Sequence, residues 1–463
     1  MHAMRLLPSH AFALALVLLV CVSVPAGPAS GQTTPAAGSP GLEGPPLGAR
    51  FTLPNGVVVL VAERPALPIV SVRVALAAGA VLDPPDKPGL ANLTALLLTR
   101  GTQTRTALEI DRAIEFVGGS LDADGGRDWS AAAVSVLRRD LDLGLDLLAD
   151  VLLRPAVPAP ELDRKREEVQ ASIRQSEQDP EWVAGRLFRS LAFPGHPYGI
   201  PVTGTEASLS RITRDDVVAF HAANYRPETT LIAIVGDVTV SQARAALSAR
   251  FGGWRAAGVG ASPPGRVTPG TPGRAATVQR DVTQASVYLG QSTVTRSHPD
   301  YYPLAVASYI LGGGSSSRLY TRVREERGLA YNVFAEYVPG LHGGMFLTGF
   351  QSENARVREV LSLVREDLVR LRRDRVGEDE LARAKAYLIG SFPLRMDTNA
   401  EVASLLLAVE QFGLGLDYPA RYRRAVEMVT SEDIRRAVRA HWDPDLMSLA
   451  VVANLSQAGL AAP

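Results

Sequence analysis

An internal repeat constrains the fold of this chain more than any other feature of its sequence. The segment ITRDDVVAFHAANYRPE begins at Ile212, and VTSEDIRRAVRAHWDPD begins at Val429, 217 positions later. The correspondence continues without a gap, from LIAIVGD (231–237) to SLAVVAN (448–454). Both copies predict a helix with a threonine N-cap and an acidic first turn, followed by a strand. A duplicated domain explains this agreement better than the chance similarity of two helices.

The repeat predicts two similar domains joined by a linker. Further upstream, ELDRKREEVQASI (161–173) parallels ELARAKAYLIGSF (380–392) at an offset of 219. Between the copies, the Pro/Gly-rich stretch 253–276 is typical of an interdomain linker. We therefore expect an N-terminal domain over 50–254, a linker over 255–277 and a C-terminal domain over 278–463.

Each half is expected to mix strands and helices. Segments 50–53 and 57–63 flank Pro-Asn-Gly, which predicts a β-hairpin. SVRVAL (71–76) alternates with period two and predicts a half-buried strand. Further strands are expected at 285–291 and 344–350. Helices are expected at 89–99, 107–117, 139–153, 161–176, 303–311, 316–327, 355–373 and 378–392. Neighbouring strands joined by short turns favour an α+β fold, with mainly antiparallel sheets layered with helices.

Residues 1–31 have the three parts of a secretory signal peptide. Arg5 supplies the positive start, AFALALVLLVCVSV the apolar run and PAGPASG the small-residue cleavage region. The apolar run is shorter than the roughly 20 residues of a membrane span. We expect cleavage near 29–31, a disordered leader over 32–49 and an exported, periplasmic product without a membrane span. An uncleaved anchor, or a lipoprotein modified at Cys21, remains as an alternative, although Val20 is larger than the residue that usually precedes a lipidated cysteine.

Composition excludes several classes of function. The 48 Lys and Arg residues balance 48 Asp and Glu residues, which argues against a nucleic-acid-binding protein. Cys21 is the only cysteine, so a disulfide framework and a thiolate-rich metal site are both excluded. If the signal peptide is removed, the mature chain contains no cysteine.

Four segments, taken in order, resemble one known family. They are DKPGLANLTALLLTRGT (86–102), FPGHPYGIPVTGT (193–205), YRPETTLIAIVGDV (225–238) and LGGGSSSRLYTRVREERGLAYNV (311–333). Together they resemble the insulinase/pitrilysin-type zinc peptidases, whose members are built from two similar domains. The resemblance covers roughly residues 50–455. It implies a zinc site on the helix expected at 89–99 and a substrate-binding site in the second half.

The zinc-binding residues of that family are replaced in this chain. The family's inverted motif H-x-x-E-H places two histidines one helical turn apart, with a glutamate between them as general base. At the matching positions this chain has Asn92, Ala95 and Leu96, and Ser172 occupies the position of the remaining glutamate ligand. Ala and Leu cannot bind zinc, and Asn and Ser are poor ligands for it. We therefore expect no metal in this chain and a plain packing helix at 89–99.

No other histidine pair replaces the missing motif in the sequence. The seven histidines are His2, His10, His196, His221, His298, His342 and His441, and no two lie within five residues of each other. His196 and Tyr198, in GHPYG, are expected to be structural turn residues. The basic run 370–375 is interpreted as a solvated helix end.

The second half keeps residues that match the family's substrate contacts. Arg324 and Tyr331 match the Arg and Tyr that family members place opposite the zinc, where they help to hold the substrate and the developing oxyanion. Without the family context, Arg324 would be interpreted as a surface ion-pair member and Tyr331 as a locally packed strand residue. Gly312, Gly313 and Gly314 form either a flexible loop beside the peptide channel or a tight turn before a helix.

These features predict the zinc-less subunit of an exported insulinase-family peptidase. In this interpretation the chain is inactive alone, and its partner is a homologous subunit that retains H-x-x-E-H and zinc. The substrate would be an unfolded peptide, held partly by strand addition. The alternative is a purely structural or peptide-binding assembly protein that resembles the core subunits of respiratory complexes. A third possibility is an enzyme with unrecognised catalytic residues.

Overall fold

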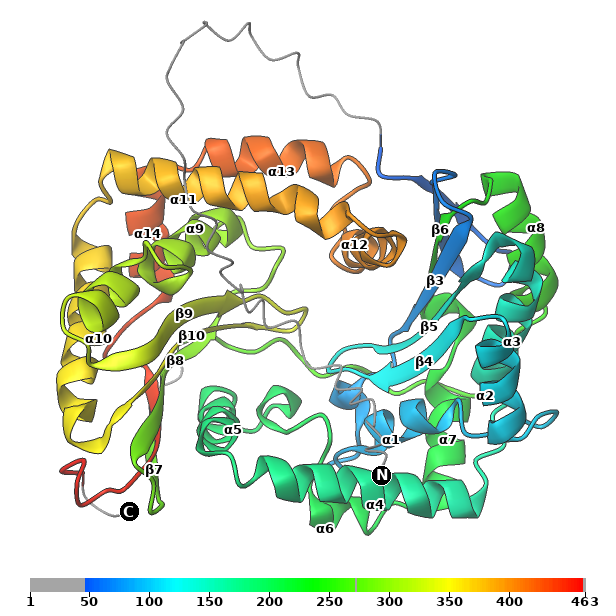
Figure 1. The fold of residues 1–463 in the computed structure, drawn as a ribbon, viewed down its shortest axis with the longest axis horizontal. Coiled ribbons are helices and arrows are strands. Elements are labelled where there is room, and N and C mark those ends of the chain that lie inside the picture. The colour runs from blue at the N-terminus through cyan, green and yellow to red at the C-terminus, as the bar shows by residue number, and fades with distance from the viewer. Residues whose placement is uncertain (1–45, 271–272, 461–463) are drawn as a thin grey trace, which may run out of the picture. The chain divides into compact units, whose positions relative to one another are not determined.

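The structure is a computed structural model that describes residues 46–270 and 273–460. The predicted signal peptide, Cys21 and the leader up to residue 45 lie outside these residues. Two β-sheets carry the fold, one in each half of the sequence (Figure 1). The strands of the first sheet are β1 (Ala49–Thr52), β2 (Val58–Glu63), β3 (Ile69–Leu76), β4 (Ser120–Gly125), β5 (Ser130–Leu137) and β6 (Thr230–Gly236). Those of the second are β7 (Ala275–Gln279), β8 (Gln284–Thr293), β9 (Ala330–Val338), β10 (Gly344–Glu353) and β11 (Ser448–Ala453).

Helices follow the strands in the same way in both halves. The helices of the first half are α1 (Leu90–Leu97), α2 (Ala107–Phe116), α3 (Leu141–Leu153), α4 (Ala159–Ser176), α5 (Pro180–Ala192), α6 (Glu206–Leu209), α7 (Arg214–Asn224) and α8 (Val240–Phe251). Those of the second are α9 (Tyr301–Gly312), α10 (Val357–Arg373), α11 (Glu378–Ser391), α12 (Asn399–Gln411), α13 (Tyr418–Glu427) and α14 (Ser431–His441), together with the π-helical segment η5 (Tyr320–Glu325). The predicted α+β class is confirmed.

Apart from the edge strand β1, the two sheets have the same topology. The first has the order β1-β2-β6-β3-β5-β4 and the second β7-β11-β8-β10-β9, so every strand of the second sheet has a counterpart in the first. The β2–β6 and β7–β11 pairs are parallel, and the other neighbouring strands are antiparallel. A shared strand order is what gene duplication produces, and it agrees with the repeat in the sequence.

The repeated helix start has the predicted cap in both copies. At the start of α7 the Thr213 side chain accepts a hydrogen bond from the amide of Asp216, and at the start of α14 Thr430 accepts one from the amide of Asp433. Each aspartate carboxylate in turn accepts from the amide of its threonine. These reciprocal bonds satisfy amide groups that have no partner inside the helix, which explains why both copies kept the threonine and the aspartate.

The connection between the halves is an extended segment. No helix or strand occurs among its described residues between Phe251, which ends α8, and Ala275, which begins β7. The expected linker at 255–277 therefore loses its last three residues to β7, which pairs in parallel with β11. At the other end of the first half, Ala49 already belongs to β1, so regular structure begins one residue before the expected domain start.

Strand β3 is more buried than its alternating sequence predicts. Six of its eight residues are buried, and the other two are partly buried. One face packs on the helices of the first half, where Val70, Val72 and Val74 join the main core. The other face is covered by α12 from the second half, so that even Ala75 is buried. The half-buried prediction was wrong because the sequence did not show that a distant helix covers the second face.

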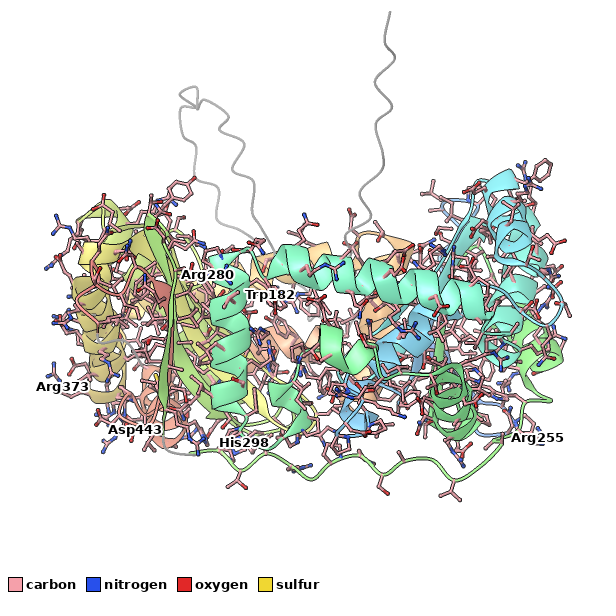
Figure 2. The ribbon with its side chains drawn as sticks, turned by 90° about the horizontal axis from the view of Figure 1, so that it is seen from below. Trp182, Arg255, Arg280, His298, Arg373 and Asp443 are labelled. Carbon is pink, nitrogen blue, oxygen red and sulfur yellow. The ribbon has the colours of Figure 1, made fainter. Side chains whose placement is uncertain are left out.

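Each half lends one helix to the sheet of the other. Helix α12 packs on β3 and β6 of the first sheet, and α5 packs on β8 and β11 of the second (Figure 1). The two helices begin 219 positions apart, at Pro180 and Asn399, which matches the offset of the repeat. Trp182, near the start of α5 in Figure 2, packs with Val183, Ala184 and Val452. Because the exchange is reciprocal, neither sheet is fully covered by its own half.

The interface under α12 is apolar, and its burial contributes strongly to stability. Its cluster combines residues from both halves: Leu60, Ala62, Ala75, Leu231, Ala233 and Val235 from the first, and Val402, Ala403, Leu406 and Leu407 from the second. Polar bonds lie around it, including the Asn399 side-chain amide donating to the Ile69 carbonyl and a bidentate pair between Arg50 and Glu410.

No helix in the described residues is both long and apolar enough to cross a membrane.

Truncating the center of this interface tests how much the exchange contributes. Leu406 is fully buried, so Leu406→Ala is expected to lower the free energy of unfolding by about 2–5 kcal/mol, through lost transfer energy and the cavity that remains. Urea denaturation followed by circular dichroism measures the change. Val369→Ala, at an exposed position of α10, is the control and is expected to stay within about 0.5 kcal/mol. A loss below 1 kcal/mol at Leu406 would contradict the packing described.

Candidate functional site

Helix α1, where the family places zinc, is a buried packing helix. Seven of its eight residues are buried, and the eighth, Leu96, is partly buried against the main core. Edge strand β4 passes so close that a Cβ on Gly125 would lie 2.4 Å from the Cα of Asn92. The Thr94 hydroxyl is buried without a hydrogen-bond partner among the described residues. Such a helix supports the sheet and has little room for a metal and a water molecule.

The side chains at the former ligand positions do not suit zinc. Asn92 is 7% exposed and Ala95 is fully buried. Ser172 lies on the exposed side of α4, a helix that contacts α1. None of Asn92, Ala95, Leu96 and Ser172 offers an imidazole, thiolate or carboxylate, which are the groups that hold zinc in proteins. The neighbourhood of the two helices is retained, whereas the chemistry of the site is not.

A carboxylate holds the start of α1. The two oxygens of Asp83 accept hydrogen bonds from the backbone amides of Gly89 and Ala91, each at 2.7 Å. Gly89 has φ 96°, a left-handed conformation that glycine adopts without strain, and its neighbour Thr203 would clash with a side chain there. Burial raises the pKa of Asp83 to about 7, although the hydrogen bonds from the two amides lower it.

Tertiary structure brings together two histidines that are far apart in sequence. His298, Asp300 and His441 form the group of potential metal ligands found among the described residues. However, Nε2 of His441 lies 2.8 Å from one oxygen of Asp300, and Arg436 lies 2.7 Å from the other. Nδ1 of His298 accepts from the Asp300 amide. These contacts form a hydrogen-bonded network around Asp300, the residue that precedes α9.

Arg324 differs from its neighbours in having no acidic partner. Within the described part of the chain, Arg318 pairs with Glu380, Arg322 with Asp367 and Arg327 with Glu359, whereas Arg324 forms no ion pair. Its guanidinium instead lies 4.3 Å from the center of the Tyr331 ring, a cation–π contact. Tyr331 is 77% exposed. The interpretation of Arg324 as an ion-pair member is therefore wrong for the described residues, whereas Tyr331 is an exposed strand residue whose ring contacts Arg324 locally.

A helix end explains why residues seven apart meet. The amide of Gly328 donates to the Arg324 carbonyl, and the amide of Leu329 donates to the Val323 carbonyl, so two carbonyls of the last helical turns find partners beyond the end of η5. Gly328 has φ 60°, so the chain reverses there at low cost. It then enters β9, whose second residue is Tyr331. The reversal places the start of this strand beside the last turn of the helix.

Tyr320 is a third member of this group that sequence reasoning missed. Its ring center lies 4.9 Å from the Arg324 guanidinium. The sequence signal was the spacing of four between Tyr320 and Arg324 in a predicted helix, which brings side chains together. The helix expected at 316–327 contains the π-helical segment η5, from Tyr320 to Glu325. Such segments are frequent at functional sites.

The glycines before this helix have packing roles. A Cβ on Gly312 would lie 2.1 Å from the Ala335 amide nitrogen of β9, and one on Gly313 would lie 2.6 Å from the Tyr309 Cα. Gly314 lies near the Tyr309 hydroxyl. Close approach of α9 to the sheet thus accounts for Gly312. Whether Gly312, Gly313 and Gly314 also contact a substrate stays a prediction.

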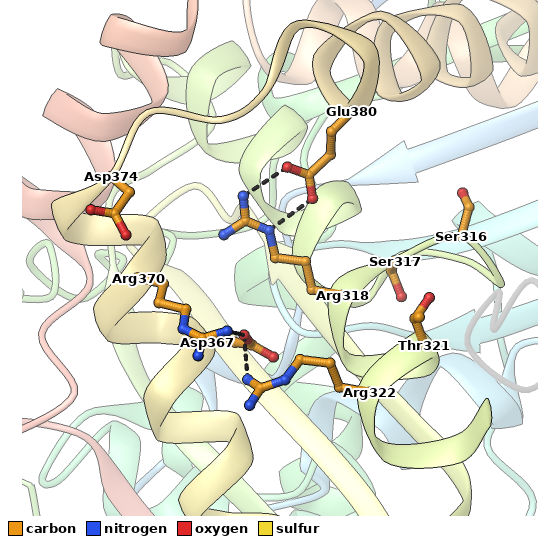
Figure 3. Close-up of a pocket in the computed structure, with 9 residues that line it drawn as sticks. All are labelled: Ser316, Ser317, Arg318, Thr321, Arg322, Asp367, Arg370, Asp374 and Glu380. Atoms are coloured by element: carbon orange, nitrogen blue, oxygen red, sulfur yellow. Dashed lines mark hydrogen bonds and ion pairs between the residues drawn. The ribbon is translucent and has the colours of Figure 1, made fainter. Parts of the chain in front are cut away.

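A polar pocket is lined by residues of this helix together with residues of α10 and α11 (Figure 3). Arg318 donates two hydrogen bonds to Glu380, both at 2.7 Å, and Arg322 reaches Asp367 at 2.6 Å. Asp367 is only 1% exposed, and burial raises its pKa while Arg322 opposes the rise. These pairs fasten the helix to α10 and α11. The charges of Arg318 and Arg322 are thereby neutralised within the protein.

Comparison with known protein families identifies the fold and its family. The family described as "Insulinase (Peptidase family M16)" matches residues 58–206, and "Peptidase M16 inactive domain" matches residues 211–388. An uncharacterized zinc protease of Mycobacterium leprae is 33% identical over 359 residues, which cover 77% of this chain and 81% of that protein. This chain belongs to the insulinase (M16) family. The predicted resemblance is confirmed.

Two further relatives support the assignment to this family. An uncharacterized zinc protease of Mycobacterium tuberculosis strain H37Rv is 32% identical over 395 residues, covering 84% of this chain and 90% of that protein. The crystal structure of a peptidase M16 inactive domain from Pseudomonas fluorescens superimposes with a TM-score of 0.83 at 27% identity, covering 88% of this chain and 97% of that one. The insulinase-family fold therefore extends over nearly all of the described residues.

The Asp83 cap of α1 predicts a pH dependence. Its pKa in the folded chain, about 7, lies above the ordinary 3.8, so the folded state holds this proton more tightly than the unfolded state. The resulting stability is present below about pH 4 and is lost as the pH rises through about 7. Urea denaturation from pH 4 to 8 should therefore show the wild-type advantage over Asp83→Asn shrinking as the pH rises. A difference that is constant or grows with pH would contradict this assignment.

Proposed function

We propose that this chain is the non-catalytic, substrate-binding subunit of an exported zinc peptidase. The proposal depends mainly on the Arg324 guanidinium, which lacks an acidic partner in the described residues and is stacked on the exposed Tyr331. The zinc-binding positions are replaced, so the zinc and its general base must come from a homologous subunit that retains H-x-x-E-H. The predicted signal peptide would export this subunit, so the pair would cleave its substrate outside the cytoplasm.

The chemistry of Arg324 and Tyr331 suits a peptide carbonyl that gains negative charge. Arginine is always charged and presents several donors in a fixed plane, and the phenol of Tyr331 adds an O–H donor. Donors aimed at a developing oxyanion contribute much of the rate in acyl-transfer enzymes. Zinc bound by the partner would supply the activated water. The role of this chain would be to hold the substrate carbonyl in line with that water.

The position of Tyr331 also favours an extended peptide as substrate. It lies in β9, which is the outermost strand of the second sheet. The outer side of such a strand offers backbone amides and carbonyls that a peptide can pair with as an added strand. An unfolded segment bound there would pass beside Tyr331, whose ring contacts the Arg324 guanidinium. Sequence-independent backbone pairing would suit varied peptides.

A structural assembly protein of the same fold is the second candidate. The replaced zinc residues and the match of residues 211–388 to an M16 inactive domain favour it, since neither requires catalysis. It differs from the first candidate in what it demands of Arg324. An assembly protein gains nothing from a guanidinium kept free of carboxylates, and it would need no partner with an intact zinc motif. A neighbouring gene for such a homologue would favour the peptidase pair.

Reconstitution with the zinc-bearing homologue tests the proposal. The purified chain alone is expected to bind no stoichiometric zinc and to hydrolyse no fluorogenic peptide, and addition of the partner should produce activity. In the pair, Arg324→Ala is expected to lower kcat/KM by about 100-fold, the size of effect seen when an oxyanion donor is removed. Metal analysis and a peptide assay measure both.

Arg327→Ala is the matched control. It removes an arginine of the same segment that is exposed and paired with Glu359, and an exposed ion pair contributes little. Normal turnover by the Arg324→Ala pair would refute the role of Arg324. Peptide hydrolysis by this chain alone that survives a chelator would instead support an enzyme with unrecognised residues.

A further inference from the structure

The linker between the halves is attached near both ends, and the stretch between these attachments has few contacts. Near its start, the Asn55 side-chain amide donates to the Trp254 carbonyl at 3.1 Å. Near its far end, the Val267 amide donates to the His342 carbonyl at 2.7 Å. Figure 2 shows the linker running along the edge of the molecule. These attachments leave residues 256–264 as a segment between two fixed points.

The backbone of 256–264 is accessible to an external binding partner. No amide or carbonyl group of this stretch takes part in a backbone–backbone hydrogen bond in the described part of the chain. Two side chains contact it: Arg226 donates to the Gly258 carbonyl, and Asn224 accepts from the Ala261 amide at 3.0 Å. A protease that binds its substrate as an extended strand therefore has to displace these two hydrogen bonds and no strand or helix.

The sequence of this stretch, AAGVGASPP, defines the kind of enzyme that can cut it. It contains no charged and no aromatic residue, so an endopeptidase that requires Lys, Arg or an aromatic side chain finds no site there. Small apolar residues occupy positions 256–261, and Val259 is 93% exposed. Exposed connecting segments of small residues are preferred places for proteolytic cutting. The stretch therefore suits an endopeptidase that cuts after small apolar side chains.

The two halves are held together without the linker. Under α12, Leu406 of the second half shares an apolar cluster with Leu231 of the first. Under α5, Phe188 of the first half shares another with Leu347 of the second. Because both clusters bury apolar side chains from both halves, they keep the halves associated after a cut in the linker.

We propose that residues 256–262 are a processing site, at which an endopeptidase specific for small apolar residues converts this chain into two fragments that stay assembled. Hydrolysis of one peptide bond consumes one water molecule. It leaves a carboxylate on the first fragment and an ammonium group on the second. The cut removes none of the contacts under α5 and α12 and none at Arg324. This inference concerns the linker alone and does not depend on the proposed function.

Limited digestion of the folded full chain with elastase, which cuts after small apolar residues, tests the proposal. Among residues 46–460, the first cuts mapped by mass spectrometry are expected between 256 and 262. The two fragments should elute together from a size-exclusion column at the volume of the intact chain, and should separate in denaturant. First cuts elsewhere in 46–460, no cut at an amount of elastase that digests the urea-unfolded chain, or fragments that elute separately would each overturn the proposal.

Val259→Phe provides a matched internal control, because chymotrypsin then has an aromatic residue to cut after in the linker. Phe116 is equally exposed, at 92%, but it ends helix α2. We expect chymotrypsin to cut after position 259 about tenfold faster than after Phe116, since a cut in a helix requires the helix to unwind first. Equal rates at the two positions would mean that exposure alone sets the cutting, which would also overturn the proposal.

Discussion

The exchange of two helices is the constraint on which the rest of this structure depends. Helix α5 of the first half covers the second sheet, and α12 of the second half covers the first. A sheet with one uncovered apolar face would not be stable in water, so each half depends on the other for a complete core. Because of the exchange, the chain crosses to the other half and returns at α5, and does so again at α12.

Duplication left two copies of one fold, and the copies then diverged in opposite directions. In the first copy, Asn92, Ala95 and Leu96 fill a helix that is tightly packed against edge strand β4. In the second, the ion pairs of Arg318 and Arg322 fasten a helix to its neighbours. Among the described residues Arg324 forms no ion pair, and its guanidinium lies against the Tyr331 ring. The matching helices of the two halves thus differ: α1 is buried by packing, whereas the helix that ends at Glu325 presents Arg324 beside the exposed Tyr331.

Local signals in the sequence predicted much of the fold. The Pro-Asn-Gly hairpin, the threonine caps of α7 and α14 and the helices from α1 to α4 are determined by turn residues, caps and apolar periodicity within a few positions. Helices α5 and α12 escaped prediction, although their spacing of 219 matches the repeat. Strand β3 was expected to be half-buried for the same reason, since its second face is covered by a helix more than 300 residues away.

The sequence by itself determined the repeat, the family resemblance and the loss of the zinc residues, because residue identity and spacing suffice for these. It also named Arg324 and Tyr331. Only the tertiary structure decided that Arg324 has no acidic partner in the described part of the chain, where Arg318, Arg322 and Arg327 each have one. It also decided that Tyr320 lies beside Arg324. It likewise brought the ring of His298 to that of His441, and the Tyr198 hydroxyl to the His342 amide, from which it accepts a hydrogen bond. Charge pairing and burial depend on which distant segments meet, and that follows from packing of the whole chain.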